Sequence, residues 1–160
     1  MLWRLGLVVL ALVAVPASVA AQRTADLSGD VAALSHSAPG FTAEVTLKSR
    51  LVAATDVFPE AEAGQFPDQI RVVRSLRIKV NGRDLFVPRS AYADLSWVTS
   101  ADVTASKVNG RLTVHGGDAS ESYFVRIEFD AQGIQSRSLY SSLIPNAPTQ
   151  QTRYFSPRVK

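Results

Sequence analysis

The sequence predicts an all-β fold, either a small antiparallel β-sandwich or an open barrel of about seven or eight strands in meander-like hairpins, with one short helix. Three observations predict it. Apolar and polar residues alternate over several short segments, as in strands that bury one face. Turn-forming residues recur about every 8–12 residues, which is typical of successive hairpins. The strand–helix alternation of a parallel sheet is absent.

The first 21 residues have the pattern of a secretory signal peptide. An arginine precedes an uncharged apolar run over residues 5–15, and small residues follow up to Ala21. The run is shorter than the roughly 20 apolar residues that span a membrane. We therefore expect cleavage between Ala21 and Gln22, with a cut one residue earlier or an uncleaved anchor as the alternatives. The expected location is the periplasm or the extracellular space.

Residues 22–40 contain few large apolar side chains and many Ala, Ser, Asp and Gly residues. This composition predicts a flexible leader, which the turn-forming pair Pro39-Gly40 closes. A single β domain is expected over residues 41–160. Its first strand is predicted at 41–50, where apolar and polar residues alternate without a break. The loop at 55–68 follows, because its two prolines and one glycine break regular structure.

The dipeptide Asn81-Gly82 predicts a tight hairpin between strands at 72–80 and 83–87. A two-residue type I′ turn needs positive φ at both central positions, which Asn and Gly adopt most readily. In the register that such a turn imposes, the apolar residues of both strands share one face. Lys79 then faces Asp84 on the other side, so charge pairing and apolar pairing agree.

The dipeptide Asn109-Gly110 repeats this pattern between residues 101–108 and 111–115. A second hairpin of the same type is predicted there. In its register Ala105 faces Val114.

The remaining elements are predicted from shorter patterns. Residues 90–95 predict the one short helix or helical turn, with Ser90 as its N-cap. The most regular alternation of the chain lies at 122–130 and predicts a core strand. A more polar strand at 134–142 is expected near a sheet edge, and 152–155 could form a last short strand.

Composition excludes several function classes. The chain has 160 residues, 17 basic and 14 acidic side chains, two histidines and no cysteine. Its basic residues are scattered, so we expect no nucleic-acid partner. Without cysteine, disulfides are excluded and a zinc centre lacks ligands. No calcium-loop, dinucleotide or P-loop motif occurs, so no cofactor or metal is expected.

Two loops carry the candidate binding residues. Aromatic residues in the polar loop at 55–68 either pack back on the sheet or anchor a partner. The loop at 116–122 is rich in hydrogen-bonding groups and ends beside a tyrosine. The candidate partner-binding residues are Phe58, Phe66, Asp118, Ser120, Glu121 and Tyr123.

These patterns favour an exported, non-catalytic binding module, for example an inhibitor, with a protein or glycan of the cell envelope as its partner. One alternative is an envelope assembly or structural protein that acts through an edge strand at 134–142 or through a basic tail with Arg153, Arg158 and Lys160. The other is a small hydrolase that uses His115, although no nucleophile-elbow motif accompanies this histidine. On balance we expect no enzyme.

Overall fold

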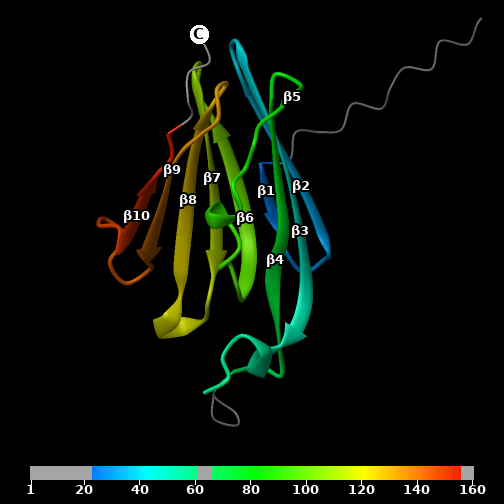
Figure 1. Ribbon diagram of the computed structural model, residues 1–160, viewed down its shortest axis with the longest axis vertical. Helices are drawn as coiled ribbons and strands as arrows, with labels where there is room; N and C mark the ends of the chain where they lie inside the picture. Colours follow the sequence, from blue (N-terminus) through cyan, green and yellow to red (C-terminus); the bar gives the residue numbers. More distant parts are fainter. Residues whose placement is uncertain (1–22, 61–65, 156–160) are drawn as a thin grey trace, which may run out of the picture.

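Two antiparallel β-sheets pack face to face in the computed structural model, which describes residues 23–60 and 66–155 (Figure 1). The predicted signal peptide and its cleavage site at Ala21 and Gln22 lie outside these residues. One sheet has six strands in the order β1-β6-β7-β8-β9-β10, and the other has four in the order β2-β3-β4-β5.

Most strands have eight residues or fewer, and β3 and β4 are longer, with 13 and 12 residues. The six-stranded sheet consists of β1 (Thr24–Asp26), β6 (Val98–Ala105), β7 (Asn109–Gly116), β8 (Tyr123–Asp130), β9 (Ile134–Ser141) and β10 (Gln150–Arg153). The four-stranded sheet consists of β2 (Val31–Ala38), β3 (Phe41–Ala53), β4 (Gln69–Val80) and β5 (Arg83–Asp84). Single turns of 3-10 helix occur at η1 (Ala54–Asp56), η2 (Arg89–Ala91) and η3 (Ala119–Glu121).

The predicted all-β antiparallel fold is confirmed, and it takes the form of a sandwich with ten strands among the described residues. The core lies between the sheets. Leu47 and Ile78 of the four-stranded sheet and Ile127 of β8 are completely buried. The rings of Phe41 and Phe129 meet across the interface, with centroids 6.4 Å apart. Side chains at every second position therefore build the core, as the alternation predicts.

The prediction of a leader before the domain is wrong for residues 24–26 and 31–38, because both segments are strands of the sandwich. β2 pairs with β3 along its whole length, from Val31 opposite Lys48 to Ala38 opposite Phe41. Pro39-Gly40 is the turn of this hairpin, with Gly40 at φ 82°. Only two side chains of β2 are buried, Ala32 and Leu34, and alanine and serine occupy most of the positions around them. The alternation of apolar and polar residues that predicts a strand is therefore weak in this segment.

The hairpin at Asn81-Gly82 is confirmed. Asn81 and Gly82 have φ values of 51° and 78°, and Lys79 pairs with Asp84 in the ladder. The second strand, however, ends at Asp84 instead of reaching residue 87. The carboxylate of Asp84 accepts hydrogen bonds from Arg77, at 2.6 and 2.7 Å, instead of contacting Lys79.

The register predicted for the second hairpin is wrong. Its turn lies two residues earlier, at 107–108, so Ala105 faces Gly110 and not Val114. The hydroxyl of Ser106 accepts the backbone N–H of Asn109 at 3.2 Å and closes this turn. Gly110 lies inside β7, where the ring of Phe129 occupies the space of a side chain. The glycine is therefore required for packing and not for a turn.

The last strands also differ from prediction. β9 pairs with β8 on one side and β10 on the other, so residues 134–142 do not form the free edge expected for strand addition. The last strand lies at 150–153 instead of 152–155. Of the short helix or helical turn predicted at 90–95, the structure has the turn, η2, but it begins at Arg89 and its N-cap is Pro88 and not Ser90.

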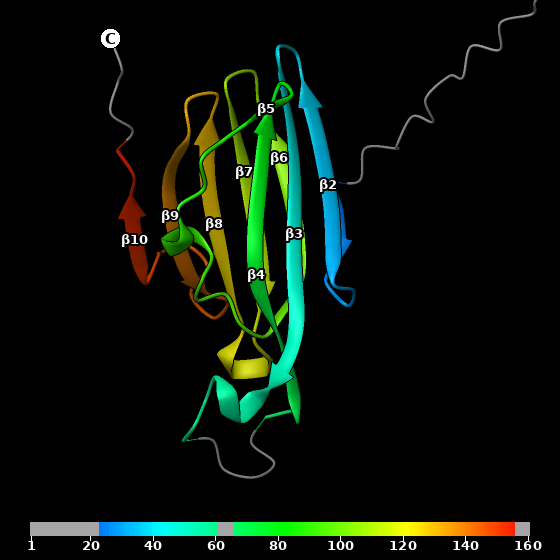
Figure 2. The same cartoon turned by 45° about the vertical axis from the view of Figure 1, so that its right-hand side comes forward.

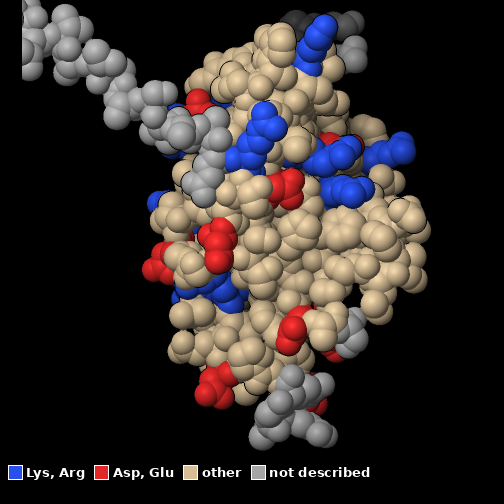
Figure 3. All heavy atoms as spheres, turned by 180° about the vertical axis from the view of Figure 1, so that it is seen from behind, with Lys and Arg blue, Asp and Glu red and all other residues tan. Residues whose placement is uncertain are grey.

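The surface carries charges of both signs. Figure 3 shows Lys and Arg side chains interspersed with Asp and Glu, and wide uncharged areas between them. Across residues 23–60 and 66–155, no helix is long and apolar enough to span a membrane.

We predict that Gly110→Ala destabilises the protein by about 1–3 kcal/mol, because the new methyl group would overlap the buried ring of Phe129. Urea unfolding measures this loss. Gly29→Ala is the matched control, because no atom lies within 4 Å of the position that its Cβ would take. Equal stability of the two variants would contradict the packing role of Gly110.

Candidate functional site

The connection from β5 to β6, residues 85–97, covers part of the six-stranded sheet that the four-stranded sheet does not reach. The four-stranded sheet packs mainly on β6 and β7. Figure 2 shows the connection crossing from β5 toward β8 and β9. Ala91 and Leu95 anchor it in the core, and Val73 of β4 donates its N–H to the carbonyl of Leu95 at 2.9 Å. Over β8 and β9, therefore, a loop takes the place that further strands of the four-stranded sheet would occupy.

A pocket of about 300 Å³ lies between this connection, β9 and the end of η3. Apolar and hydrogen-bonding side chains share its wall. We call it the Arg137 pocket, and its lining residues are Asp94, Leu95, Ser96, Glu121, Ser122, Tyr123, Arg137, Leu139, Tyr140, Ser141 and Thr149.

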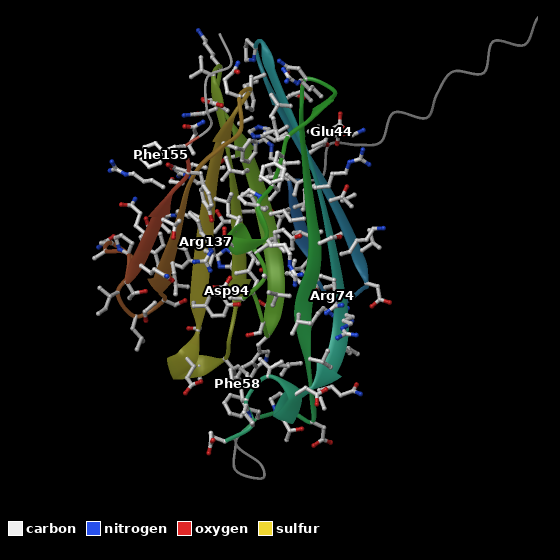
Figure 4. The ribbon with its side chains drawn as sticks, in the orientation of Figure 1. Glu44, Phe58, Arg74, Asp94, Arg137 and Phe155 are labelled. Atoms are coloured by element: carbon white, nitrogen blue, oxygen red, sulfur yellow. The ribbon has the colours of Figure 1, made fainter. Side chains whose placement is uncertain are left out.

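Arg137 is the most unusual residue of the pocket, because its charged side chain is only 3% exposed. Its Nη2 donates to Asp94 Oδ2 at 2.7 Å (Figure 4), and its Nη1 makes a long contact of 3.5 Å with Gln150 Oε1. Its Nε is buried and has no hydrogen-bond partner among the described residues. A buried donor without a partner costs free energy.

Tyr123 joins β8 to the connection. Its hydroxyl donates to the carbonyl of Ser96 at 2.5 Å, and its ring occupies the space that a side chain at position 116 would need. Burial raises the pKa of Tyr123 to about 12. The phenol is therefore protonated at neutral pH, and it fixes the pocket wall as a hydrogen-bond donor.

Only some of the binding residues predicted in and beside the loop at 116–122 line the Arg137 pocket. Glu121 and the adjacent Tyr123 line the Arg137 pocket. Asp118 is exposed and is not among the lining residues. Ser120 belongs to η3, and its side chain lies outside the described part of the structure.

Phe58 lies at the end of the sandwich formed by η1 (Figure 4), and Phe66 lies against it. The rings of Phe58 and Phe66 stack with centroids 4.7 Å apart, and Phe66 meets the edge of Trp97 at 5.4 Å. Both phenylalanines are half-buried. This arrangement favours the interpretation that they pack against the protein's own sheet end.

The sequence reasoning missed Arg137 and Asp94. Within a strand at 134–142, strict alternation places Ile134 and Arg137 on opposite faces. The ladder between β8 and β9 contains a register shift beside Phe129, and this irregularity turns both residues inward. An arginine among the polar residues of β9 gave no signal for burial.

The histidines do not form a catalytic constellation with the described residues. His115 Nε2 lies 3.4 Å from Asp102 Oδ2, and its ring packs 5.9 Å from that of Phe124. None of the hydrogen bonds of the described residues joins the imidazole of His115 to a serine or threonine hydroxyl. His36 Nδ1 accepts the backbone N–H of Ala105 at 2.7 Å, so it links the two sheets.

Comparison of the chain with protein-family models, curated proteins and solved structures gave no match. The described residues also contain no group of three or more His, Cys, Asp or Glu side chains placed to hold a metal ion. The Arg137 pocket is the feature on which the proposed function below is based.

We predict that Tyr123→Phe lowers the free energy of unfolding at neutral pH by about 1 kcal/mol, because it removes the hydrogen bond to Ser96. The pKa of Tyr123 is raised above the ordinary value near 10, so its contribution to stability is complete below about pH 10. It is lost as the pH rises through about 12. Urea unfolding at neutral and alkaline pH tests this, and identical alkaline slopes for both proteins would contradict it.

We predict that Asp94→Asn destabilises the protein by about 1–3 kcal/mol, because buried Arg137 loses its carboxylate partner. The 60% exposure of Asp94 keeps the expected loss below that of a fully buried pair. Adding Arg137→Met should recover most of the loss, since no unpaired charge then remains. A double-mutant cycle measures the coupling, with Asp118→Asn as the control; strict additivity would contradict the prediction.

Proposed function

We propose that this protein is a non-catalytic binding module that holds a small ligand in the Arg137 pocket. The observation that carries the proposal is the charged side chain of Arg137, which is only 3% exposed and lines the wall of a cavity. A ligand oxygen that accepts an N–H of this guanidinium would offset part of the cost of its burial. The volume of about 300 Å³ is at the small end of the range for ligand pockets.

The lining defines the chemistry of the ligand. Leu95, Leu139 and the ring of Tyr123 offer apolar surface for its body. The charge of Arg137 is already balanced by Asp94, and Glu121 adds a further carboxylate at the pocket. A neutral acceptor therefore fits better than an anion. An amide carbonyl of a peptide or a hydroxyl of a sugar satisfies both conditions.

The proposed place of action is outside the cytoplasm. The apolar run at residues 5–15 and the small residues before Gln22 support export. The absence of cysteine means that the fold needs no oxidising enzyme after export. A peptide or glycan of the cell envelope is the kind of ligand that such a protein would meet.

The test is an NMR titration of the cleaved protein with neutral fragments, N-acetylated amino-acid amides in one series and monosaccharides in the other. Saturable shifts of the amide resonances of Leu95 and Leu139 are expected in at least one series. Leu139→Trp should abolish them by filling the pocket, and Val108→Trp, in an exposed turn, should not. Absence of saturable shifts, or their persistence in Leu139→Trp, would overturn the proposal.

A further inference from the structure

A second hollow of about 530 Å³ lies on the other side of residues 94–96. Its walls come from β3, β4, η1 and the connection that contains η2. We call it the arginine groove, and its lining residues are Arg50, Val52, Asp56, Val57, Val72, Val73, Arg74, Arg89, Tyr92, Ala93, Asp94, Leu95 and Ser96.

The groove collects three guanidinium groups from three separate elements. Arg50 belongs to β3, Arg74 to β4 and Arg89 to η2. Within residues 23–60 and 66–155, no carboxylate lies within ion-pair distance of any of them. Other arginines of the same sheet behave differently. Arg71 and Arg77 each bind an aspartate, at 2.9 and 2.6 Å.

The backbone of β4 is irregular where it enters the groove. Lys48 of β3 pairs with Ser75 and Ser49 pairs with Val73, so Arg74 is an extra residue with no partner in the ladder. A bulge of this kind re-aims the side chain of the extra residue, and bulges of this kind are over-represented next to active sites. The side chain of Arg74 is exposed and lines the groove (Figure 4). The irregularity therefore adds a positive charge to the site.

The charges of the groove do not balance. Two carboxylates line it, but that of Asp94 is bound to Arg137. Among the described residues, three arginine side chains and the single remaining carboxylate, of Asp56, leave two positive charges. Like charges held together cost free energy in the absence of a counter-charge. The arginines of β4 and of the connection cannot separate by a movement of the connection, because backbone contacts fix it to β4. These are the hydrogen bond from Val73 to Leu95 and the bridge between Val72 and Ser96.

We infer that the arginine groove binds the phosphate group of a phosphorylated ligand. A phosphate monoester carries close to two negative charges at neutral pH, which matches the excess in the groove. Guanidinium groups bind its oxygens through paired N–H donors, a geometry that lysine does not offer. The ligand is a free phosphorylated small molecule or a phospholipid headgroup. This site is distinct from the Arg137 pocket and does not depend on the function proposed for it.

The experiment measures binding of pyrophosphate by isothermal titration calorimetry at constant ionic strength, using the chain without its predicted signal peptide, residues 22–160. Saturable binding is expected for the unchanged protein. Arg74→Gln should weaken it about tenfold, whereas Arg83→Gln, which removes the same charge from the exposed hairpin turn, should leave it within twofold. Urea unfolding of both variants establishes that they are folded.

A second arm uses sedimentation with phosphatidic acid vesicles and with phosphatidylcholine vesicles. Binding of pyrophosphate identifies a free phosphate ligand, and Arg74-dependent binding to phosphatidic acid vesicles alone identifies a lipid headgroup; either result supports the inference. Absence of binding in both arms, or equal weakening by Arg74→Gln and Arg83→Gln, would overturn it. Because Leu139→Trp alters only the Arg137 pocket, unchanged pyrophosphate binding by this variant would separate the two sites.

Discussion

The two sheets of the sandwich differ in width, and the narrower one packs mainly on β6 and β7 and covers β8 and β9 less completely. The inner face of β8 is apolar, and leaving it in water would cost about 25 cal/mol for each Å² exposed. The connection at 85–97 provides the cover, with Leu95 as its buried anchor. Because a loop packs on a sheet less closely than a pair of strands does, a space remains between the connection and the six-stranded sheet. This space is the Arg137 pocket.

The ion pair between Arg137 and Asp94 determines how this cover is attached. A charged group that is 3% exposed has lost most of its hydration, and only one strong hydrogen bond, to Asp94, compensates. The pair joins residues 43 positions apart in the sequence. Asp94 also lines the arginine groove, so the two candidate sites share the wall formed by residues 94–96.

The sequence pattern was sufficient to predict an element wherever the backbone conformation depends only on residues that are neighbours in the chain. Strand β8 and the turn at Asn81-Gly82 form as predicted, because strong alternation and positive φ are local properties. The second Asn-Gly pair shows the limit of this reasoning. Gly110 has no side chain, and the ring of Phe129 from the next strand fills the space that one would occupy. The turn itself lies at residues 107–108.

The candidate site was predictable only in part. Glu121 and Tyr123 were identified from a polar loop that ends beside an aromatic residue, and both line the pocket. Arg137 was not, because its burial follows from a register shift between β8 and β9, which no pattern within one strand reveals. The same holds for Arg74, whose place in the groove depends on its bulge against β3.

The order of residues along this chain was enough to establish an all-β antiparallel domain, because every-second-residue burial is a property of a single strand. Which strands pair, and how the two sheets pack, could not be predicted from any single segment of the sequence. Residues 31–38 became a strand because β3 offered an edge, and Arg137 became buried because residues 85–97 closed over it. Both outcomes depend on contacts between segments distant in the chain, and such contacts decide where the candidate sites lie.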